Sequence, residues 1–257
     1  MRRGWTVGDG AEIDWLVELT GPEVTGFDPG GTPDGLWILN AMYENETPSA
    51  RTHHERHRAD LADGTTEPWR FGSYDERDHP ELIVPGGGLG WSAHPGAGWR
   101  RLLWSELAER IGDPIVPPGL YPSYRAFPSV RRDGSWPESI LPPTEGSMDR
   151  DSFRRLATVL ARFDDPRTTV FAHYCPCVTG EYDEYRVYRG RLGDLDALEE
   201  LNGEFGPSNL WPADRAWLTY TDYDLWGTKV SGPPELLRLI DQDDVLETVR
   251  LPLSVDG

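Results

Sequence analysis

Lysine and cysteine are the scarcest of the residue types that often carry chemistry in this sequence. Lys229 is the only lysine, and Cys175 and Cys177 are the only cysteines. Two cysteines are too few for a disulfide framework, so core packing must supply the stability. Basic residues are also outnumbered, with Lys+Arg 25 against Asp+Glu 44 and a formal net charge of -19. This balance excludes general binding of double-stranded nucleic acid and of anionic membrane surfaces, because both depend on clustered basic side chains.

Long apolar runs are absent as well. No stretch of the sequence approaches the roughly 20 apolar residues that a membrane-spanning helix needs. No apolar segment follows Arg2 and Arg3, and the first acidic residue is already Asp9. We therefore expect no signal peptide and no membrane contact, and we expect the protein to be cytoplasmic.

Aromatic side chains, in contrast, are abundant. Hydrophobic residues make up 37% of the chain and aromatic residues 11%, with Trp 11 and Tyr 10. Such a composition can build a core, which argues against a disordered acidic chain. We expect a folded, acidic, Trp-rich protein.

The composition changes once along the chain, where prolines interrupt residues 112–147. So many prolines exclude a long helix, so this segment is the candidate connection between two lobes. Its aromatics are unusual for a free linker, and we expect it to pack along the body of the protein. The predicted organisation is an N-terminal α+β lobe over residues 1–111, the packed connection, and a C-terminal α+β lobe over residues 148–257, with one continuous domain as the alternative. The aromatics concerned are Tyr121, Tyr124, Phe127 and Trp136.

Periodicity and turn signals predict both helices and strands in the N-terminal lobe. Thr52 and Glu55 form a capping box, so a helix should begin there and end before Gly64. Residues 36–43 are mostly apolar between turn signals and predict one buried strand. Further predicted elements are a helix over residues 11–19 with Ile13, Trp15, Leu16 and Leu19 facing the core, a strand over residues 82–84, and a helix that Ser105 caps and Gly112 ends.

The C-terminal lobe shows a clearer pattern. Residues 149–163 place apolar side chains at helical spacing and predict an amphipathic helix. Hairpins alternate with helices in the remainder, so the predicted fold class is α+β, a mostly antiparallel sheet with helices packed on it and two lobes that share a core. The elements expected there are strands over residues 168–174 and 184–188, a helix over 195–201, a hairpin of strands 217–221 and 226–230, a helix that starts at Pro233, and a strand over 245–251.

The histidines within residues 52–58 resemble a metal motif, because two histidines one helical turn apart can share a metal ion. The zinc-protease signature needs His-Glu-x-x-His, but His57 follows His54 one position too early, and Arg58 stands in place of the second ligand. A bare pair of His54 and His57 is the alternative, although the neighbouring arginines would repel a cation. We interpret the segment as a solvated helix face.

His173, Cys175 and Cys177 alternate along the chain. They share one face if residues 168–178 are extended throughout. Thiolates and an imidazole suit Zn²⁺, and another segment could supply a fourth ligand. Structural zinc sites usually use Cys-x-x-Cys turns, however, and Pro176 favours an extended path or an end to strand pairing. We favour a simpler interpretation, in which the two cysteines are buried and unoxidised beside a core histidine. A redox role is the third possibility. We predict no metal and no cofactor.

Gly86, Gly87 and Gly88 follow the predicted strand over residues 82–84 and could bring backbone amides to a phosphate. The loop lacks both the Gly-x-Gly-x-x-Gly register before a helix and the Gly-Lys-Ser/Thr ending of a nucleotide-binding loop. We interpret it as a turn that leads into an ordered loop.

Asp222 and Asp224 could supply paired carboxylates for acid-base chemistry or for a hard cation. Aspartate is also the usual residue of a tight hairpin turn, where it accepts hydrogen bonds from nearby backbone amides, and we favour the turn. Glu184 belongs to a similar acidic turn and is the third candidate carboxylate. No Gly-x-Ser-x-Gly elbow and no convincing Ser, His, Asp set accompanies them.

Four segments carry a resemblance to other proteins. They are Leu-Trp-Ile-Leu-Asn-Ala-Met-Tyr-Glu at 36–44, Gly-Trp-Arg-Arg-Leu at 98–102, Pro-Ser-Asn-Leu-Trp-Pro at 207–212 and Asp-Tyr-Asp-Leu-Trp-Gly-Thr-Lys-Val at 222–230. On these segments the chain resembles an uncharacterised family of actinobacterial proteins, over most of its length. The resemblance implies no activity and no catalytic residue. Acidic, compact proteins of such genomes include many immunity proteins that neutralise a toxin by covering a basic site, an analogy of charge rather than of motif.

These observations predict a non-catalytic cytoplasmic binding protein. It would act as an immunity-type inhibitor that binds a basic protein partner. Residues 1–50 carry 2 basic and 9 acidic side chains, and residues 201–257 carry 4 and 10, so the two ends would make one acidic face if they meet. The candidate anchors are Trp217, Trp226 and Tyr223, because Trp and Tyr often dominate interface energetics. The alternative is a hydrolase acting on a small or sugar-like substrate through Trp platforms and paired carboxylates.

Overall fold

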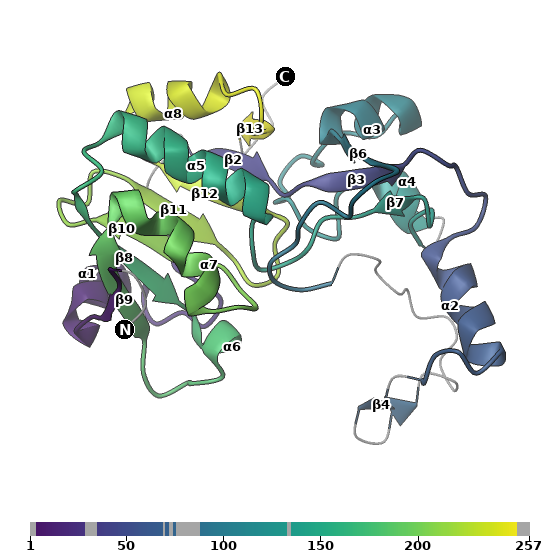
Figure 1. Ribbon diagram of the computed structural model, residues 1–257, viewed down its shortest axis with the longest axis horizontal. Coiled ribbons are helices and arrows are strands. Elements are labelled where there is room, and N and C mark those ends of the chain that lie inside the picture. The colour runs from purple at the N-terminus through teal and green to yellow at the C-terminus, as the bar shows by residue number, and fades with distance from the viewer. Residues whose placement is uncertain are drawn as a thin grey trace.

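The computed structural model describes residues 4–28, 35–68, 70–71, 74–75, 88–132 and 135–250. Within these residues the strands form an eight-stranded sheet, a three-stranded sheet and a two-stranded hairpin (Figure 1). Strand pairing inside all three is antiparallel. Helices pack on the two larger sheets. The fold is therefore α+β with mostly antiparallel sheets, which confirms the predicted fold class.

The eight-stranded sheet takes strands from both ends of the chain. Its order is β1 (Thr6–Val7), β9 (Arg186–Arg191), β8 (Thr169–Tyr174), β10 (Asn209–Pro212), β11 (Leu218–Thr221), β12 (Gly227–Ser231), β2 (Leu36–Leu39) and β13 (Thr248–Arg250). The predicted hairpin is confirmed as β11 and β12. Both β1 and β2 lie in residues 1–111 but pair with strands from residues 148–257, so the two predicted lobes share this sheet.

One face of the large sheet carries α5 (Arg150–Phe163) and α8 (Pro234–Asp241), which lie side by side, with α7 (Leu198–Leu201) nearby (Figure 1). Asp149 caps α5, because the backbone N of Ser152 donates a hydrogen bond to Asp149 Oδ1 at 2.9 Å. The predicted amphipathic helix is thus confirmed. Its buried apolar side chains are Phe153, Leu156, Val159 and Leu160.

The opposite face is partly covered by α1 (Asp14–Thr20), which follows a 3-10 helix over Gly10–Ile13. Ile13 and Leu16 pack there against Phe27 and Trp211. The prediction that Leu19 faces the core is wrong, because this side chain is 64% exposed. The inward stripe follows positions 13, 16, 17 and 20, and position 19 lies beside it.

The three-stranded sheet has the order β6 (Trp99–Leu102), β3 (Met42–Asn45) and β7 (Ile140–Leu141), with α3 (Trp104–Ile111) and α4 (Pro128–Arg132) in the same part of the molecule (Figure 1). Two buried aromatics of its core, Phe127 and Trp136, come from the proline-rich residues 112–147. Tyr121 and Tyr124 from the same segment are about half exposed. The segment therefore packs on the body and also contributes to the surface.

The predicted strand over residues 36–43 consists of two strands in different sheets. One ends just before Asn40, and the other begins just after Ala41. The side chain of Asn40 is fully buried and donates hydrogen bonds to Thr144 O and Ser147 O, both at 2.8 Å. A buried amide requires such partners, and these two bonds hold Asn40 at the point where the chain leaves one sheet and enters the other.

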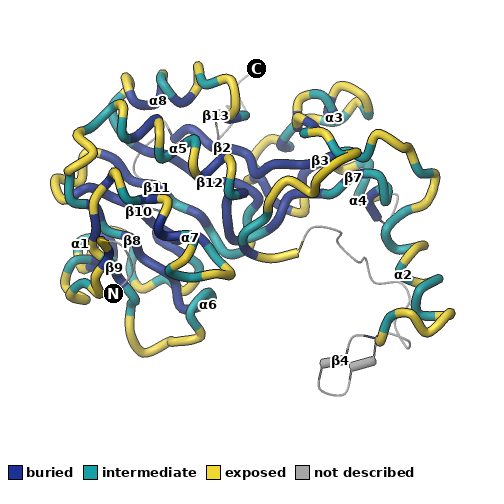
Figure 2. Tube along the Cα trace, in the orientation of Figure 1, coloured by how far each residue is buried: buried dark blue, intermediate teal, exposed yellow. Residues whose placement is uncertain are grey.

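The predicted helix with the capping box is confirmed as α2 (His53–Ala62). The backbone N of Glu55 donates to Thr52 Oγ1 at 3.1 Å, and the backbone N of Thr52 donates to Glu55 Oε2 at 2.8 Å. No residue of α2 is buried, and Figure 2 shows the helix projecting from the two larger sheets. His54 and His57 lie on this helix.

The N-terminus of α3 is capped by a distant side chain rather than by Ser105. Glu247 accepts hydrogen bonds from the backbone N of Trp104 at 2.7 Å and of Ser105 at 2.8 Å. The helix begins one residue before the predicted cap. Gly112 ends it with a φ of +72°, a left-handed conformation that suits glycine.

The remaining elements complete the comparison with the sequence. β10 is a central strand that the sequence analysis does not predict. The predicted strand over residues 82–84 lies outside the described residues, as do Gly86 and Gly87. A small hairpin joins β4 (Arg70–Phe71) and β5 (Tyr74–Asp75), and a 3-10 helix over Leu192–Ala197 precedes α7. Within the described part of the chain, no helix has the length and apolar character to cross a membrane.

Candidate functional site

The N-terminal segment over residues 21–28 lies against the turn between β11 and β12. The backbone N of Tyr223 donates a hydrogen bond to Thr25 O at 3.2 Å. The Thr25 hydroxyl donates one to Asp222 Oδ2 at 2.7 Å. The acidic N-terminal and C-terminal parts of the chain therefore meet at this turn.

Asp222 holds the turn together. Its Oδ2 accepts hydrogen bonds from the hydroxyls of Thr25 and Tyr220, the latter at 2.6 Å, and its Oδ1 accepts one from the backbone N of Asp224 at 2.9 Å. The last bond is the side-chain contact expected of an aspartate turn. Burial and the charge of Asp222 raise the pKa of Tyr220, which keeps the phenol protonated as a donor. Both carboxylate oxygens of Asp222 are thus engaged in structure.

Glu145 and Asp224 form a second acidic pair at the same turn. Glu145 is brought there because the backbone N of Gly146 donates to Leu225 O at 3.2 Å. Burial first and the charge of Asp224 second raise the pKa of Glu145. Burial first and the charge of Asp222 second raise the pKa of Asp224. Because like charges and desolvation disfavour the ionised forms, a basic group placed here would be stabilised.

Tyr223 interacts with both of these carboxylates and with Cys177, and two side chains with exposed apolar surface lie around Cys177. Val24 is 50% exposed and Tyr182 is 67% exposed, and the Tyr223 ring lies 5.7 Å from that of Phe205. Cys177 is their common neighbour, since its backbone N donates to Val24 O at 3.2 Å and its thiol raises the pKa of Tyr182. We define the acidic-tyrosine surface as Glu23, Val24, Glu145, Tyr182, Tyr223 and Asp224.

The other two predicted anchors lie in the interior. Trp217 is 1% exposed and belongs to the core beneath α8. Trp226 is 3% exposed and lies between Trp104 and Trp136, with ring centroids 6.1 and 6.0 Å away. These tryptophans stabilise the fold, and of the three predicted anchors only Tyr223 reaches the acidic-tyrosine surface.

Glu184 is exposed in the segment before β9. Among the hydrogen bonds and ion pairs of the described residues, none joins it to Asp222 or Asp224. The structure instead brings Glu145 to Asp224. No sequence pattern links Glu145 to the turn, because their contact depends on how the proline-rich segment packs.

The condition for a shared face of His173, Cys175 and Cys177 does not hold. β8 ends at Tyr174, and α6 (Pro176–Thr179) begins at the proline, which suits the first turn of a helix. The alternation of an extended strand is therefore lost between the imidazole and the second thiol. Within the described residues, no group of three or more His, Cys, Asp and Glu side chains could hold a metal ion.

His173 is a fully buried core histidine. Its Nδ1 lies 3.2 Å from Asn209 Oδ1, and its ring packs between Phe27 and Tyr185 at 5.2 and 5.6 Å. Burial lowers the pKa of His173 to about 4. Burial also raises the pKa of the Cys175 thiol, whereas Cys177 is only half-buried.

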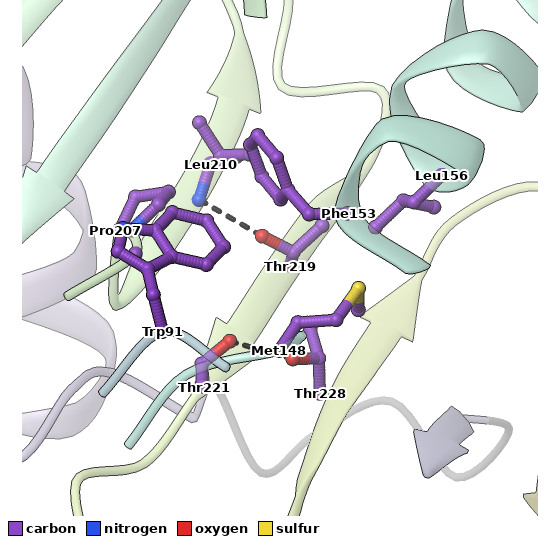
Figure 3. A pocket seen from close by; sticks show the side chains of 10 residues that line it. Trp91, Met148, Phe153, Leu156, Pro207, Leu210, Thr219, Thr221 and Thr228 are labelled. Atoms are coloured by element: carbon purple, nitrogen blue, oxygen red, sulfur yellow. Dashed lines mark hydrogen bonds between the residues drawn. The ribbon is translucent and has the colours of Figure 1, made fainter. Parts of the chain in front are cut away.

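The core beneath α5 contains a small pocket (Figure 3). Its volume is about 10 Å³, the space of one water molecule. Thr221 and Thr228 share a hydrogen bond of 2.7 Å in its wall, and the backbone N of Leu210 donates to Thr219 Oγ1 at 3.1 Å. This pocket is too small for a substrate.

Comparison of the chain with protein-family models, with curated proteins and with solved structures gives no significant match. The resemblance to an actinobacterial family stays a prediction from the sequence.

Proposed function

We propose that the protein is a non-catalytic cytoplasmic binding protein whose acidic-tyrosine surface covers a basic site on a protein partner, in the manner of an immunity-type inhibitor. One observation carries the proposal. The two acidic parts of the sequence meet at the turn between β11 and β12, and the exposed side chains of Val24 and Tyr182 lie near it, around Cys177.

Charge and apolar area support a protein partner together. Burial first and like-charge repulsion second raise the pKa values of Glu145 and Asp224, and a lysine or arginine of the partner would relieve the repulsion. Tyr182 supplies a large ring with few rotatable bonds, which is typical of side chains that anchor interfaces. Carboxylates beside a large exposed ring complement a basic protein surface better than a small cation, because a cation would leave the ring of Tyr182 unused.

The surface is also held in place before any partner binds. Hydrogen bonds from Thr25 and Tyr220 fix the Asp222 carboxylate, and the backbone contact between Tyr223 and Thr25 fixes the neighbouring segment. Preformed groups lose less conformational entropy on association.

The test is affinity capture from the native host, followed by measurement of the affinity for the captured partner. The double variant Tyr182→Ala with Asp224→Arg should weaken binding at least about thirtyfold. Matched controls are Tyr121→Ala and Asp196→Arg, which alter an exposed tyrosine and an exposed aspartate outside the acidic-tyrosine surface. The proposal predicts a basic partner that the controls retain. Equal binding by the double variant, or capture of no basic protein, contradicts it.

A hydrolase is the second candidate function, and the raised pKa values of Glu145 and Asp224 favour it. A carboxyl group whose ionisation is disfavoured by burial and by a neighbouring carboxylate can act as the acid while the neighbour acts as the base. The Tyr223 and Phe205 rings, rather than the buried tryptophans, would then contact the substrate. Screening with nitrophenyl glycosides and esters tests this function. Turnover that Asp224→Asn abolishes supports it, and absence of turnover across the panel contradicts it.

A further inference from the structure

A pocket larger than the one beneath α5 lies in the proline-rich part of the chain and extends onto α4. Its volume is about 480 Å³, within the range of small-molecule sites. Every lining residue in the described part of the chain falls within residues 117–132, so one short segment forms its walls. These residues are Pro117, Leu120, Arg125, Pro128 and Arg132.

Apolar side chains form the larger part of this wall. Pro117, Leu120 and Pro128 offer two rings and a branched chain. Ligand sites are usually apolar, with a few polar groups that orient the ligand. A ligand with an apolar body would lose contact with water against these residues, which favours its binding.

The walls are fixed before a ligand binds. The backbone N of Leu120 donates a hydrogen bond to Pro117 O at 3.1 Å and closes a turn. Gly119 in this turn has a φ of +77°, a left-handed conformation that suits glycine. The start of α4 is held because the backbone N and the hydroxyl of Ser129 both donate to the Asp113 carboxylate at 2.7 Å. A preformed pocket loses less conformational entropy when it binds.

Phe127 fixes the backbone between Arg125 and Pro128. Its φ is +53°, a left-handed conformation that is unfavourable for a residue with a side chain, and a residue before proline prefers an extended backbone. The ring is fully buried, with the rings of Trp104 and Trp136 at 5.1 and 5.7 Å, so core packing holds this conformation. The core therefore sets the positions of the two lining residues on either side of Phe127.

The charged residues that line the pocket are both arginines. No acidic residue of the described chain lines it, although the whole sequence has Asp+Glu 44 and Lys+Arg 25. Arg132 ends α4, and Arg125 lies three residues before the helix begins. The pocket is thus complementary to an anionic group.

Arg125 can bind such a group directly. Its Nε donates to Tyr124 Oη at 3.1 Å, and its guanidinium carbon lies 5.5 Å from the centre of the Tyr124 ring. Among the hydrogen bonds and ion pairs of the described residues, none involves its two terminal nitrogens. The parallel N–H groups of a guanidinium match the two oxygens of a carboxylate.

We propose that this pocket binds a small monocarboxylate with an apolar body, an aryl or branched-chain acid, whose carboxylate contacts the terminal N–H groups of Arg125. The apolar body lies against Pro117, Leu120 and Pro128. One negative charge suits the site better than two, because a chain of net charge -19 repels a dianion more strongly. None of these residues belongs to the acidic-tyrosine surface, so the inference does not depend on the proposed function.

The experiment titrates the isotope-labelled full chain with phenylacetate and follows the backbone amides by NMR. Four further probes separate the two requirements. Phenylacetamide lacks the charge, phenethylamine reverses it, acetate lacks the ring, and inorganic phosphate lacks the ring and carries more charge. We expect phenylacetate to shift amides centred on residues 117–132, and the other probes to bind at least about tenfold more weakly.

Substitutions of Arg125 test the carboxylate contact. Arg125→Gln should weaken phenylacetate about tenfold, the effect of one lost hydrogen-bonded charge. Arg125→Lys keeps the charge but loses the paired donors, so its effect should be smaller. Arg162→Gln, which alters an exposed arginine on α5, is the matched control and should leave the affinity unchanged. The melting temperatures should not change, because both arginines are exposed.

Four outcomes overturn the proposal: no binding of phenylacetate, equal binding of phenylacetamide or phenethylamine, amide shifts centred outside residues 117–132, or unchanged affinity in Arg125→Gln.

Discussion

The phenol of Tyr220 donates a hydrogen bond to the carboxylate of Asp222, with 2.6 Å between Oη and Oδ2. The same oxygen accepts the hydroxyl of Thr25 at 2.7 Å. One carboxylate oxygen thus joins a strand of the C-terminal part to a segment near the N-terminus. The acidic-tyrosine surface depends on this junction for its shape.

Replacing Asp222 by Ala should therefore destabilise the protein. The change leaves two hydroxyls without their charged acceptor, and hydrogen bonds to charged groups contribute roughly 1.5–3 kcal/mol each. We expect a loss of about 2–3 kcal/mol in the free energy of unfolding, because the site is partly solvated. Urea unfolding measures it.

Asp224→Ala is the matched control for this prediction. Asp224 is exposed, and among the hydrogen bonds of the described residues none involves its carboxylate. The loss should stay within about 0.5 kcal/mol, as for ordinary surface substitutions. An equal loss in both variants would show that Asp222 does not join the two segments.

Local signals predict several helices and the hairpin of β11 and β12, but they do not predict every strand. Thr52 with Glu55, and Asp149 before an apolar stripe, act within one turn of the chain, so the sequence reveals them. The sequence does not predict β10, because Asn209 and Pro212 are poor strand formers. The strand tolerates Asn209 because its side-chain amide donates hydrogen bonds to Phe27 O at 2.8 Å and to Thr219 O at 3.0 Å.

The candidate site was predictable only in part, for the same reason. The turn of Asp222 and Asp224 follows from the local chemistry of aspartate and was recognised. The addition of Glu145 and the burial of Trp217 and Trp226 depend on tertiary packing. Abundant tryptophan indicated anchors, but a core and an interface require the same side chains, and composition does not distinguish them.

Lys229 should resist amine-reactive reagents in the folded protein. Its side chain is 9% exposed, and Nζ forms an ion pair with Asp28 Oδ1 at 2.8 Å. It is the only lysine of the chain, so peptide mapping after acetylation gives one unambiguous readout. We expect slow acetylation in buffer and fast acetylation in urea.

Asp28→Ala should increase the rate of Lys229 acetylation in buffer, because it removes the paired carboxylate. Asp14→Ala, which alters an exposed aspartate on α1, is the control and should leave the rate unchanged. Fast acetylation of the wild-type protein in buffer would contradict the buried ion pair.

His173 should make stability depend on pH in the weakly acidic range. Burial lowers its folded pKa to about 4, below the unfolded value of about 6.5. Between these values the unfolded chain binds the proton and the folded chain does not, so stability falls as pH drops from 6.5 towards 4. The loss should be on the order of 3 kcal/mol and should be absent above pH 6.5.

Urea unfolding at a series of pH values isolates this effect when the wild type is compared with His173→Gln. The variant is less stable at neutral pH, but it should lack the histidine contribution to the slope between pH 4 and 6.5. Identical slopes in the two proteins would show that His173 titrates normally in the folded state.

The two thiols should differ in reactivity, although they are only two residues apart. Cys175 is buried, its pKa is raised by burial, and its backbone N donates to Ser208 Oγ at 3.1 Å. Cys177 is half-buried beside the exposed Tyr182. Iodoacetamide should therefore label Cys177 first and should reach Cys175 only when the protein unfolds. Mass spectrometry of timed samples, with Cys177→Ser as the control that leaves one slow thiol, measures the order.

Elemental analysis of the same preparation should find no stoichiometric zinc. One zinc per chain, together with equal protection of both thiols, would refute the assignment of Cys175 and Cys177 as free thiols.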